Sequence, residues 1–542
     1  MFGGLQRVLF GSKETQSRQD SRPTARYMRP DSSNLLGGWR PALRSQRQDV
    51  KEAWTGVAAR AIDAAHNSGW ITGAIEQMVA DINGPEGLTI NVAPDHQALR
   101  WSYDFAYAWA SDVEREFVAY ANSPLECDAR GKATLATMAD AIVRWYMPFG
   151  EGLGRILLRE RAGATMLTKV QLVSPIRLSQ QSSELEDLHQ GVFLDGDGQP
   201  IGYRFRARAN GYDQDLDVAA RDPDGRPLVV HVFDGDPDAT RGISPFAPAL
   251  KVTRQYDQLA DATLTTALLQ TIFAATFESA QLPAEALEGL LTENDFGAGS
   301  GGQVDPTAPG GMAALMGARA EWYGASGIDL GTHGRIATMF PGDQLKFTTA
   351  ETPGSNYLPF SQNLNREIAR CIGTSYEKYT GDYQGATFSS IKMSIASDWP
   401  VVVRRRRVIP RPFLQAVFEA WLEERIARGL TPYPGGYSRF LKQRAAATRA
   451  TWRGPAKPSP DELKTAMALK VLVKDLGVMS VSTAAGEIGL DADAEQQQRA
   501  QDRATAIRLN LPDPYAPPPG SLPSPDPAKL LEDAEDGPAR RP

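Results

Sequence analysis

Two stretches in the second half of the chain carry side chains that could bind a ligand or a partner. The first runs from Tyr376 to Ser390 and combines tyrosines, hydroxyl groups and a lysine with glycines. The second is a run of arginines, whose guanidinium groups suit DNA phosphates or a neighbouring subunit's carboxylates. The candidate contact residues are Lys378, Tyr379, Asp382, Tyr383, Gln384, Thr387, Arg404, Arg405, Arg406 and Arg407. An ordinary polar surface loop and a solvated helix face are the alternatives for the two stretches.

The sequence lacks patterns typical of catalysis, nucleotide binding and metal binding. Glu126 stands where the first glycine of a phosphate-binding loop would be needed. Asp195 and Asp197 resemble the start of a calcium loop, but the later ligands do not follow, so a hairpin turn is expected. The histidines show no metal-ligand spacing, and His231 lies in an apolar strand pattern that indicates a packed side chain. We therefore expect no enzyme activity, no cofactor and no metal.

Charge and composition limit the classes of partner. The formal net charge is -7, so general attraction to nucleic acid is not indicated and any DNA contact must be local. No run approaches the ~20 apolar residues needed to span a bilayer, and the N-terminus lacks the apolar centre of a signal peptide. Cys127 and Cys371 are too few for a disulfide framework, which fits a reducing compartment. We expect a soluble, globular protein that stays in the cytoplasm where it is made.

Two helices are expected to position the first stretch. Apolar residues recur at helical spacing from Phe360 to Ile372 and predict a helix that ends at Gly373, where a left-handed cap is favoured. A second helix is expected to end near Asp398, because one proline precedes the four arginines and two come after them. These prolines are Pro400, Pro410 and Pro412. A further amphipathic helix is expected to end at Gly429.

The first half of the chain is expected to mix helices and strands. Residues 1–50 show no sustained periodicity and indicate an arm that is disordered when alone. Helical patterns cover 50–82, with a break near residues 67–69, and then 103–120 and 133–146. Strands separated by hairpin turns follow up to residue 233.

Longer helices are expected in the second half. Ser244 and Pro245 predict the start of a long helix that continues to about Ala280. Residues 297–311 are nearly all small, which indicates an exposed flexible insertion. Ser459 and Glu462 form a capping-box pattern that predicts a helix as far as residue 477, and a very polar helix is expected over 492–508.

Several segments in a fixed order resemble the portal proteins of tailed bacteriophages, specifically the lambda-type family. The segments are Val173-Ser-Pro-Ile-Arg-Leu-Ser179, His231-Val-Phe233, Thr240-Arg-Gly-Ile-Ser-Pro245, Ala274-Ala-Thr-Phe-Glu-Ser279, and the run from Phe340-Pro-Gly-Asp343 through Gly373-Thr-Ser-Tyr-Glu377 to the arginines. The resemblance covers roughly residues 50–500. Its specificity lies in the order and spacing of these segments, because no single motif is diagnostic.

The resemblance implies an α+β portal-protein fold with a mixed α/β wing, a long-helix stem, a projecting clip and a helical crown. The implied divisions are a flexible N-terminal arm (1–50), the wing (51–242), a stem helix (243–280), the clip (281–345), a second stem helix (346–375), a tunnel loop (376–390), the wing with the Arg-rich helices (391–455), the crown helices (456–510) and a disordered tail (511–542). The first candidate stretch then lies in the tunnel loop, which would line a channel.

The same resemblance implies a function for an assembly, not for one chain. It implies a homo-oligomeric ring of about twelve subunits at the unique capsid vertex of a virion, assembled in the host cytoplasm. Double-stranded DNA would pass through it without sequence readout during packaging and ejection. The implied partners are the terminase, the major capsid and scaffold proteins, and the head-completion or tail connector protein, with no membrane. The alternatives are a structural head or tail adaptor without a channel and, less favoured, a metal-dependent DNA-processing enzyme.

Overall fold

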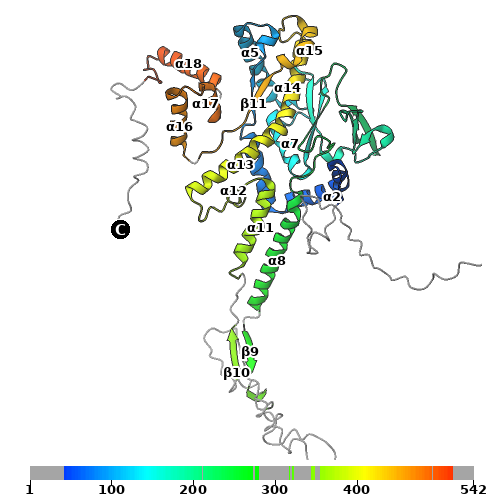
Figure 1. The fold of residues 1–542 in the computed structure, drawn as a ribbon, viewed down its shortest axis with the longest axis vertical. Helices are drawn as coiled ribbons and strands as arrows, with labels where there is room; N and C mark the ends of the chain where they lie inside the picture. The colour runs from blue at the N-terminus through cyan, green and yellow to red at the C-terminus, as the bar shows by residue number, and fades with distance from the viewer. Residues whose placement is uncertain are drawn as a thin grey trace, which may run out of the picture.

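The computed structural model describes residues 42–209, 212–272, 275–279, 317, 320–322, 343–347, 354–459, 461–490 and 492–516. The predictions for the N-terminal arm up to residue 41, for most of the 281–345 insertion and for the tail beyond residue 516 lie outside these residues. The described chain forms a body of helices and sheets from which two helices project (Figure 1). None of the described helices is both long and apolar enough to cross a membrane.

The main core of the body is built around α14 (Pro410–Ala427). Phe413, Val417, Phe418 and Trp421 on this helix are fully buried. The longer helices that share this core are α3 (Gly69–Asn83), α5 (Tyr103–Ala121) and α7 (Leu135–Phe149), with α2 (Gln46–Asn67) packed beside them. Shorter helices are α4 (His96–Leu99), α6 (Pro124–Cys127) and α15 (Gly436–Ala447). These bounds confirm the helices predicted in the first half of the chain, but α2 begins at Gln46, so the prediction that the disordered arm extends to residue 50 is wrong for residues 46–50.

Antiparallel sheets form the other side of the body. A three-stranded sheet has the order β3-β2-β8, and a four-stranded sheet has the order β4-β5-β6-β7. The strands are β2 (Glu151–Leu158), β3 (Thr168–Leu172), β4 (Leu188–His189), β5 (Val192–Leu194), β6 (Pro200–Ala209), β7 (Tyr212–Ala219) and β8 (Val229–Phe233). A separate two-stranded sheet pairs β1 (Thr89–Val92) with β11 (Ala450–Arg453).

The predicted hairpin turn after β5 is confirmed. The carboxylate of Asp195 accepts hydrogen bonds from the backbone N–H groups of Asp197, at 3.0 Å, and Gln199, at 2.7 Å. This side chain therefore stabilises the turn by the contact that aspartate commonly makes there.

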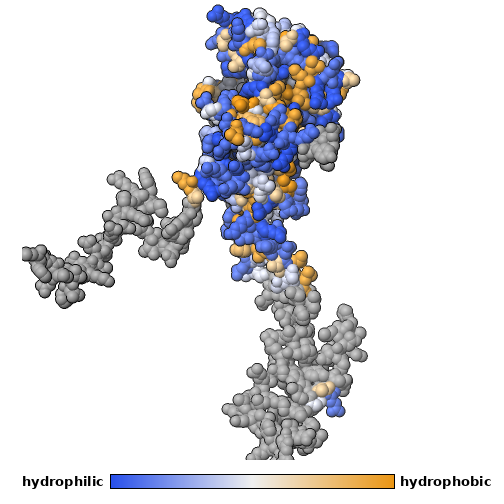
Figure 2. Space-filling model, turned by 90° about the vertical axis from the view of Figure 1, so that its right-hand side faces the viewer, coloured by the Kyte–Doolittle hydropathy of each residue, from blue (hydrophilic) through white to orange (hydrophobic). Residues whose placement is uncertain are grey.

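Two helices, α8 (Leu250–Ile272) and α11 (Tyr357–Ile372), pack side by side and project from the body. Beyond them β9 (Ala275–Ser279) and β10 (Asp343–Phe347) pair as antiparallel strands (Figure 1). Gly373 ends α11 in the left-handed conformation, as predicted. Figure 2 shows that hydrophobic side chains interrupt a mostly hydrophilic surface on the body and on the projecting helices.

The long helix predicted over 243–280 is shorter than expected at both ends. A short 3-10 helix, η3 (Ala247–Ala249), precedes α8, because Pro248 lacks an N–H group and the chain tightens before the regular helix begins. Ser244 binds the body instead of capping α8, since its hydroxyl donates to the carbonyl of Met147 at 2.7 Å. The C-terminal end of the predicted helix is a strand, because Ala275–Ser279 pairs with β10.

The region after α11 also differs from the prediction. Tyr376–Thr380 forms a short helix, α12, and α13 runs without interruption from Phe388 to Val408. Pro400 lies inside α13, so the prediction that this helix ends near Asp398 is wrong. The interruption falls at Ile409, directly before Pro410 at the first position of α14, where proline is tolerated.

A group of helices follows the body at the C-terminal end. It contains α16 (Glu462–Lys470), a single π turn η4 (Val471–Asp475), α17 (Val481–Glu487) and α18 (Ala492–Arg508). Asp461 caps α16 by accepting a hydrogen bond from the Lys464 N–H, so the predicted cap at Ser459 is two residues too early. We call this group, residues 461–516, the C-terminal unit.

Candidate functional site

The stretch from Tyr376 to Thr387 lies where the projecting helices meet the body (Figure 1). It begins with α12, turns at Gly381 in the left-handed conformation, and ends at the N-terminus of α13. The backbone N–H of Ser375 donates to the carboxylate of Asp398 on α13 at 2.9 Å. Both ends of the stretch are therefore fixed to α13, and we call these residues, 376–387, the linking segment.

Two of the candidate contact residues point inward, toward α3 and α8. Lys378 forms an ion pair with Asp81 at the C-terminal end of α3. Tyr379 is 8% exposed, and its ring lies 5.9 Å from that of Trp70, which in turn contacts Tyr256 of α8 at 6.4 Å. Burial raises the pKa of the Tyr379 hydroxyl. Tyr379 therefore packs the linking segment against the root of the projecting helices.

The other candidates in the linking segment serve its turn or face solvent. Asp382 accepts hydrogen bonds from the Tyr376 hydroxyl at 3.3 Å and from the Gln384 backbone N–H at 3.0 Å. Thr387 forms a capping box with Ser390 at the start of α13. Tyr383 is 52% exposed and the side chain of Gln384 is also exposed. Tyr383 and Gln384 are thus accessible to a molecule outside the subunit.

A hollow of about 380 Å³ lies between the linking segment, α3 and α13. Lys378 and Tyr383 line one side, and Ile391, Ile395 and Trp399 of α13 line the other. The side of the linking segment that faces α13 is therefore not closely packed.

The arginines divide into two buried and two exposed side chains. Arg405 and Arg406 are 6% and 9% exposed, whereas Arg404 and Arg407 are exposed. Arg404 binds the carboxylate of Asp234 with both terminal nitrogens, at 2.6 and 2.7 Å. Contact with DNA or a partner stays a prediction. Of the four arginines, only Arg404 and Arg407 are exposed on the subunit and could make such a contact.

Arg406 joins three segments of its own subunit. Its guanidinium donates to the carbonyls of Ile82 at 2.8 Å, Asp81 at 3.0 Å and Pro455 at 3.3 Å. It also lies over the ring of Trp399 at 5.4 Å. Burial lowers the pKa of Arg406 to about 10, which still leaves it protonated at neutral pH. Its positive charge therefore holds the C-terminal end of α3 against α13.

Sequence reasoning missed a buried ionic cluster between the body and α8. Glu151, the first residue of β2, and Arg241, which precedes η3, both have fully buried side chains. The Nε of Arg241 donates to the two carboxylate oxygens of Glu151 at 3.0 and 2.8 Å. His231 on β8 lies 3.0 Å from the same carboxylate, so the prediction that this histidine is packed is confirmed.

Close backbone approach explains why glycines flank this cluster. A Cβ atom at Gly150 would lie 2.1 Å from the backbone of Ile243, and one at Gly242 would lie 2.0 Å from the Gly150 carbonyl oxygen. The only signal in the sequence was a charged residue beside glycine in both places. Gly150 caps the C-terminal end of α7 in the left-handed conformation, and β2 begins at Glu151.

The electrostatics of the cluster favour the ionised carboxylate. Burial alone would raise the pKa of Glu151, but the charge of Arg241 and the hydrogen bonds from His231 and Arg241 outweigh it and lower the pKa to about 2. The cluster is buried, so its role is to fix the root of α8 to the sheet. Within the described ranges, no group of three histidine, cysteine or acidic side chains is placed to hold a metal ion.

Comparison with known proteins gives a consistent result. Residues 32–406 match the model of a family described as phage portal protein, lambda family. The chain is 26% identical to the portal protein of Escherichia phage N15 over 489 residues, 88% of this chain and 89% of that protein. It is also 26% identical to portal protein B of Escherichia phage lambda over 449 residues, 81% of this chain and 82% of that protein.

Among solved structures, the chain is similar to one from the neck of a native gene transfer agent particle computed with C12 symmetry. The alignment covers 84% of this chain and 97% of that chain, with 14% identity and a TM-score of 0.41.

Proposed function

The chain belongs to the lambda family of phage portal proteins, with the α+β fold expected of it, and from this membership we propose that it forms a closed ring at one capsid vertex. A cyclic arrangement of identical subunits encloses a channel that no single chain can form, and we propose about twelve subunits. Double-stranded DNA enters through this channel during packaging and leaves through it during ejection. The chain acts as a structural component of the virion and is assembled in the host cytoplasm.

The pair of projecting helices is the observation that supports this proposal in the structure. Leu264 on α8, and Leu358 and Phe360 on α11, are 61%, 60% and 54% exposed. Large apolar side chains on a narrow projection gain about 25 cal/mol for each Å² of apolar surface that is removed from water. Neighbouring copies arranged around a ring would cover these side chains, so we assign α8 and α11 to the stem.

The insertion, the C-terminal unit and the linking segment are assigned by their positions relative to the stem. The insertion between α8 and α11 (281–345) is the clip that docks the terminase and later the head-tail connector. The C-terminal unit is the crown. The linking segment lies within the tunnel loop (376–390), and Tyr383 and Gln384 are the side chains we expect to meet DNA. Contacts without strong phosphate binding suit a channel through which DNA must slide in both directions.

The first test is negative-stain electron microscopy of the purified full chain, classified for rotational symmetry, together with mass photometry. We expect rings with a central hole. The variant Leu358→Asp should lower the ring fraction at least about tenfold, because it places a charge in the proposed interface. Leu185→Asp, at a fully exposed leucine of the body, is the matched control and should form rings like the unmodified chain.

Other results would favour the rival functions. Monomers and dimers alone, even with scaffold protein and a crowding agent, would remove the ring and favour a head or tail adaptor without a channel. Metal-dependent cleavage of plasmid DNA by the purified chain would favour a DNA-processing enzyme.

A further inference from the structure

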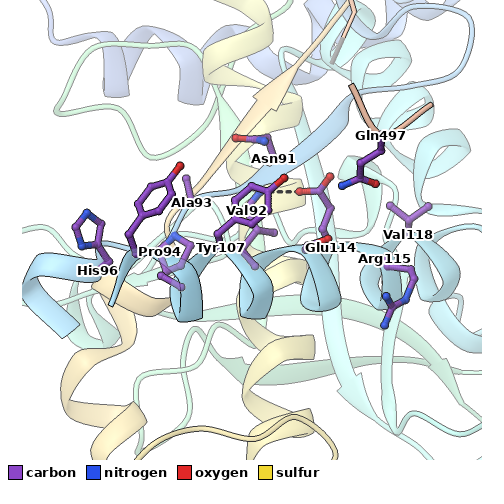
Figure 3. Close-up of a pocket in the computed structure, with 14 residues that line it drawn as sticks. Asn91, Val92, Ala93, Pro94, His96, Tyr107, Glu114, Arg115, Val118 and Gln497 are labelled. Carbon is purple, nitrogen blue, oxygen red and sulfur yellow. Dashed lines mark hydrogen bonds between the residues drawn. The ribbon is translucent and has the colours of Figure 1, made fainter. Parts of the chain in front are cut away.

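A surface groove lies between the body and the C-terminal unit, and none of its lining residues belongs to the projecting helices or to the linking segment. It has a volume of about 520 Å³ and follows one face of α5. β1 and the residues after it form a second wall, and Gln497 of α18 closes one end (Figure 3). Figure 3 places His96 at the opposite end from Val118 and Gln497.

Aromatic rings dominate the part of the groove near His96. Tyr103 and Tyr107 are 68% and 45% exposed, and their rings are stacked with centroids 6.4 Å apart and planes 17° apart. The ring of His96 meets Tyr103 edge-on at 6.0 Å. Stacked, exposed tyrosines form the flat apolar surface on which proline rings pack in aromatic grooves that bind proline-rich peptides.

The polar groups of the groove also suit such a peptide. Proline residues have no backbone N–H, and a polyproline II helix makes no internal hydrogen bonds, so the carbonyl groups of a proline-rich segment remain open to donors from a partner. The two tyrosine hydroxyls and the side-chain amides of Asn91 and Gln497 can supply donors along the groove. Glu114 lies at the centre of the groove, where its carboxylate accepts a hydrogen bond from the Val92 backbone N–H at 3.0 Å.

The chain itself carries a proline-rich segment directly after the helix that closes the groove. Residues 517–527 read Pro-Pro-Pro-Gly-Ser-Leu-Pro-Ser-Pro-Asp-Pro. After α18 the described chain reverses its direction at Asn510, which has a φ of 55°. Tyr515 then packs beneath Arg499, with the guanidinium 4.5 Å from the ring centroid. The described chain therefore ends close to the level of Gln497 along α18.

We propose that the groove binds residues 521–527 of the same subunit as a polyproline II segment. Arg499 is on the far side of α18 from Gln497, so the chain must pass around a helix about 10–12 Å wide. The path around half of the helix is ~16–19 Å, and residues 517–520 suffice because the five steps from Ala516 to Ser521 reach ~17–18 Å when extended. The next seven residues span ~22 Å. The α5 face from Val118 to Tyr103 is also ~22 Å long.

This match of lengths sets a register that can be tested. With Ser521 at the Val118 end, Ser524 lies opposite Ser111, which is ~10 Å along α5. Asp526 then lies ~16 Å along α5, opposite Tyr107, whose hydroxyl can donate a hydrogen bond to its carboxylate. The docked segment would hold the C-terminal unit against α5. The proposal concerns one subunit and is independent of ring formation.

Disulfide trapping in the full chain tests the register. Ser111→Cys and Ser524→Cys are combined with Cys371→Ser, since Cys371 is half-buried whereas Cys127 is buried. Mild oxidation should close this pair within one chain at least about tenfold faster than the control pair Leu185→Cys and Ser524→Cys. Equal rates for the two pairs, or products only between chains, would overturn the proposal.

A second variant separates recognition from mere proximity. Tyr103→Ser with Tyr107→Ser, added to the trapping pair, removes the stacked rings and should slow closure at least about tenfold. The melting temperature should not change, because both side chains are exposed. Trapping at an undiminished rate would show that the tyrosines do not bind the segment and would also overturn the proposal.

Discussion

Glu151 is a residue whose replacement we expect to destabilise the subunit strongly without changing the shape of its side chain. Glu151→Gln keeps the shape of the side chain but leaves Arg241 buried without its counter-charge, which costs about 3–5 kcal/mol. Glu76→Gln is the matched control, because Glu76 and Arg144 are 53% and 45% exposed and such a pair contributes under about 1 kcal/mol. Urea unfolding of the two variants measures the difference. Equal free energies of unfolding would contradict the prediction.

The same residue gives the subunit an acid-sensitive contribution to stability. The pKa of Glu151 is about 2 in the folded chain against an ordinary value of 4.5. A carboxyl group whose pKa is lowered by folding stabilises the protein above its unfolded pKa, and this contribution is lost as the pH falls from about 4.5 toward 2. The free energy of unfolding should therefore fall more steeply between about pH 5 and about pH 3 in the unmodified chain than in Glu151→Gln. Parallel pH profiles would rule this out.

The arginines offer a comparison between structural and contact roles. Arg406→Ala removes a buried cation from three carbonyl groups and should cost about 2–4 kcal/mol. Arg407→Ala, at an exposed neighbour, should stay within about 0.5 kcal/mol. Chemical denaturation measures both. A large loss of stability in Arg407→Ala with none in Arg406→Ala would reverse the assignment.

The inward direction of two arginines was in principle visible in the sequence. Val402, Arg405, Arg406 and Ile409 are all buried, and their spacing of three, four and seven residues is that of one helical face. The expectation that Pro400 ends the helix hid this pattern. The partners of Arg406, carbonyl groups near residues 82 and 455, could not be predicted, because they come from distant parts of the chain.

At the scale of elements, the linking segment separates a packing tyrosine from an accessible one. Tyr383→Ala should leave the melting temperature unchanged, because the side chain is 52% exposed, yet reduce DNA retention in filled particles if the segment lines the channel. Tyr379→Ala should instead destabilise the subunit by about 3–5 kcal/mol, because it empties the contact with Trp70. Retention assays and thermal unfolding read the two effects separately. Normal packaging and retention in Tyr383→Ala would remove Tyr383 from the channel.

The sequence predicted structural features well where these depend on residues only a few positions apart. The cap at Gly373, the turn at Asp195 and the break between α2 and α3 follow from residue preferences within a few positions. The end of α8 does not, since Ala275–Ser279 becomes a strand only because β10 pairs with it. Such long-range pairing is invisible to periodicity.

At the scale of the whole molecule, the order of segments indicated the family, while the packing of the parts required the structure. Among the described residues, the buried clusters of the body extend no further along the chain than Trp452. Neither α16 nor α17 has a buried residue. The C-terminal unit is therefore attached to a body whose core is complete without it.

A truncation tests this division. A chain that ends after Lys457 keeps Trp452 and the Pro455 carbonyl that accepts from Arg406, so its body should unfold cooperatively within a few degrees of the full chain. A chain that ends after Arg439 loses Phe440, Ala447 and Trp452 from the core and should not fold. Calorimetry distinguishes the two. Loss of cooperative unfolding in the longer truncation would show that the C-terminal unit is part of the folding unit, whereas retention would leave it available as a separate contact surface in the proposed ring.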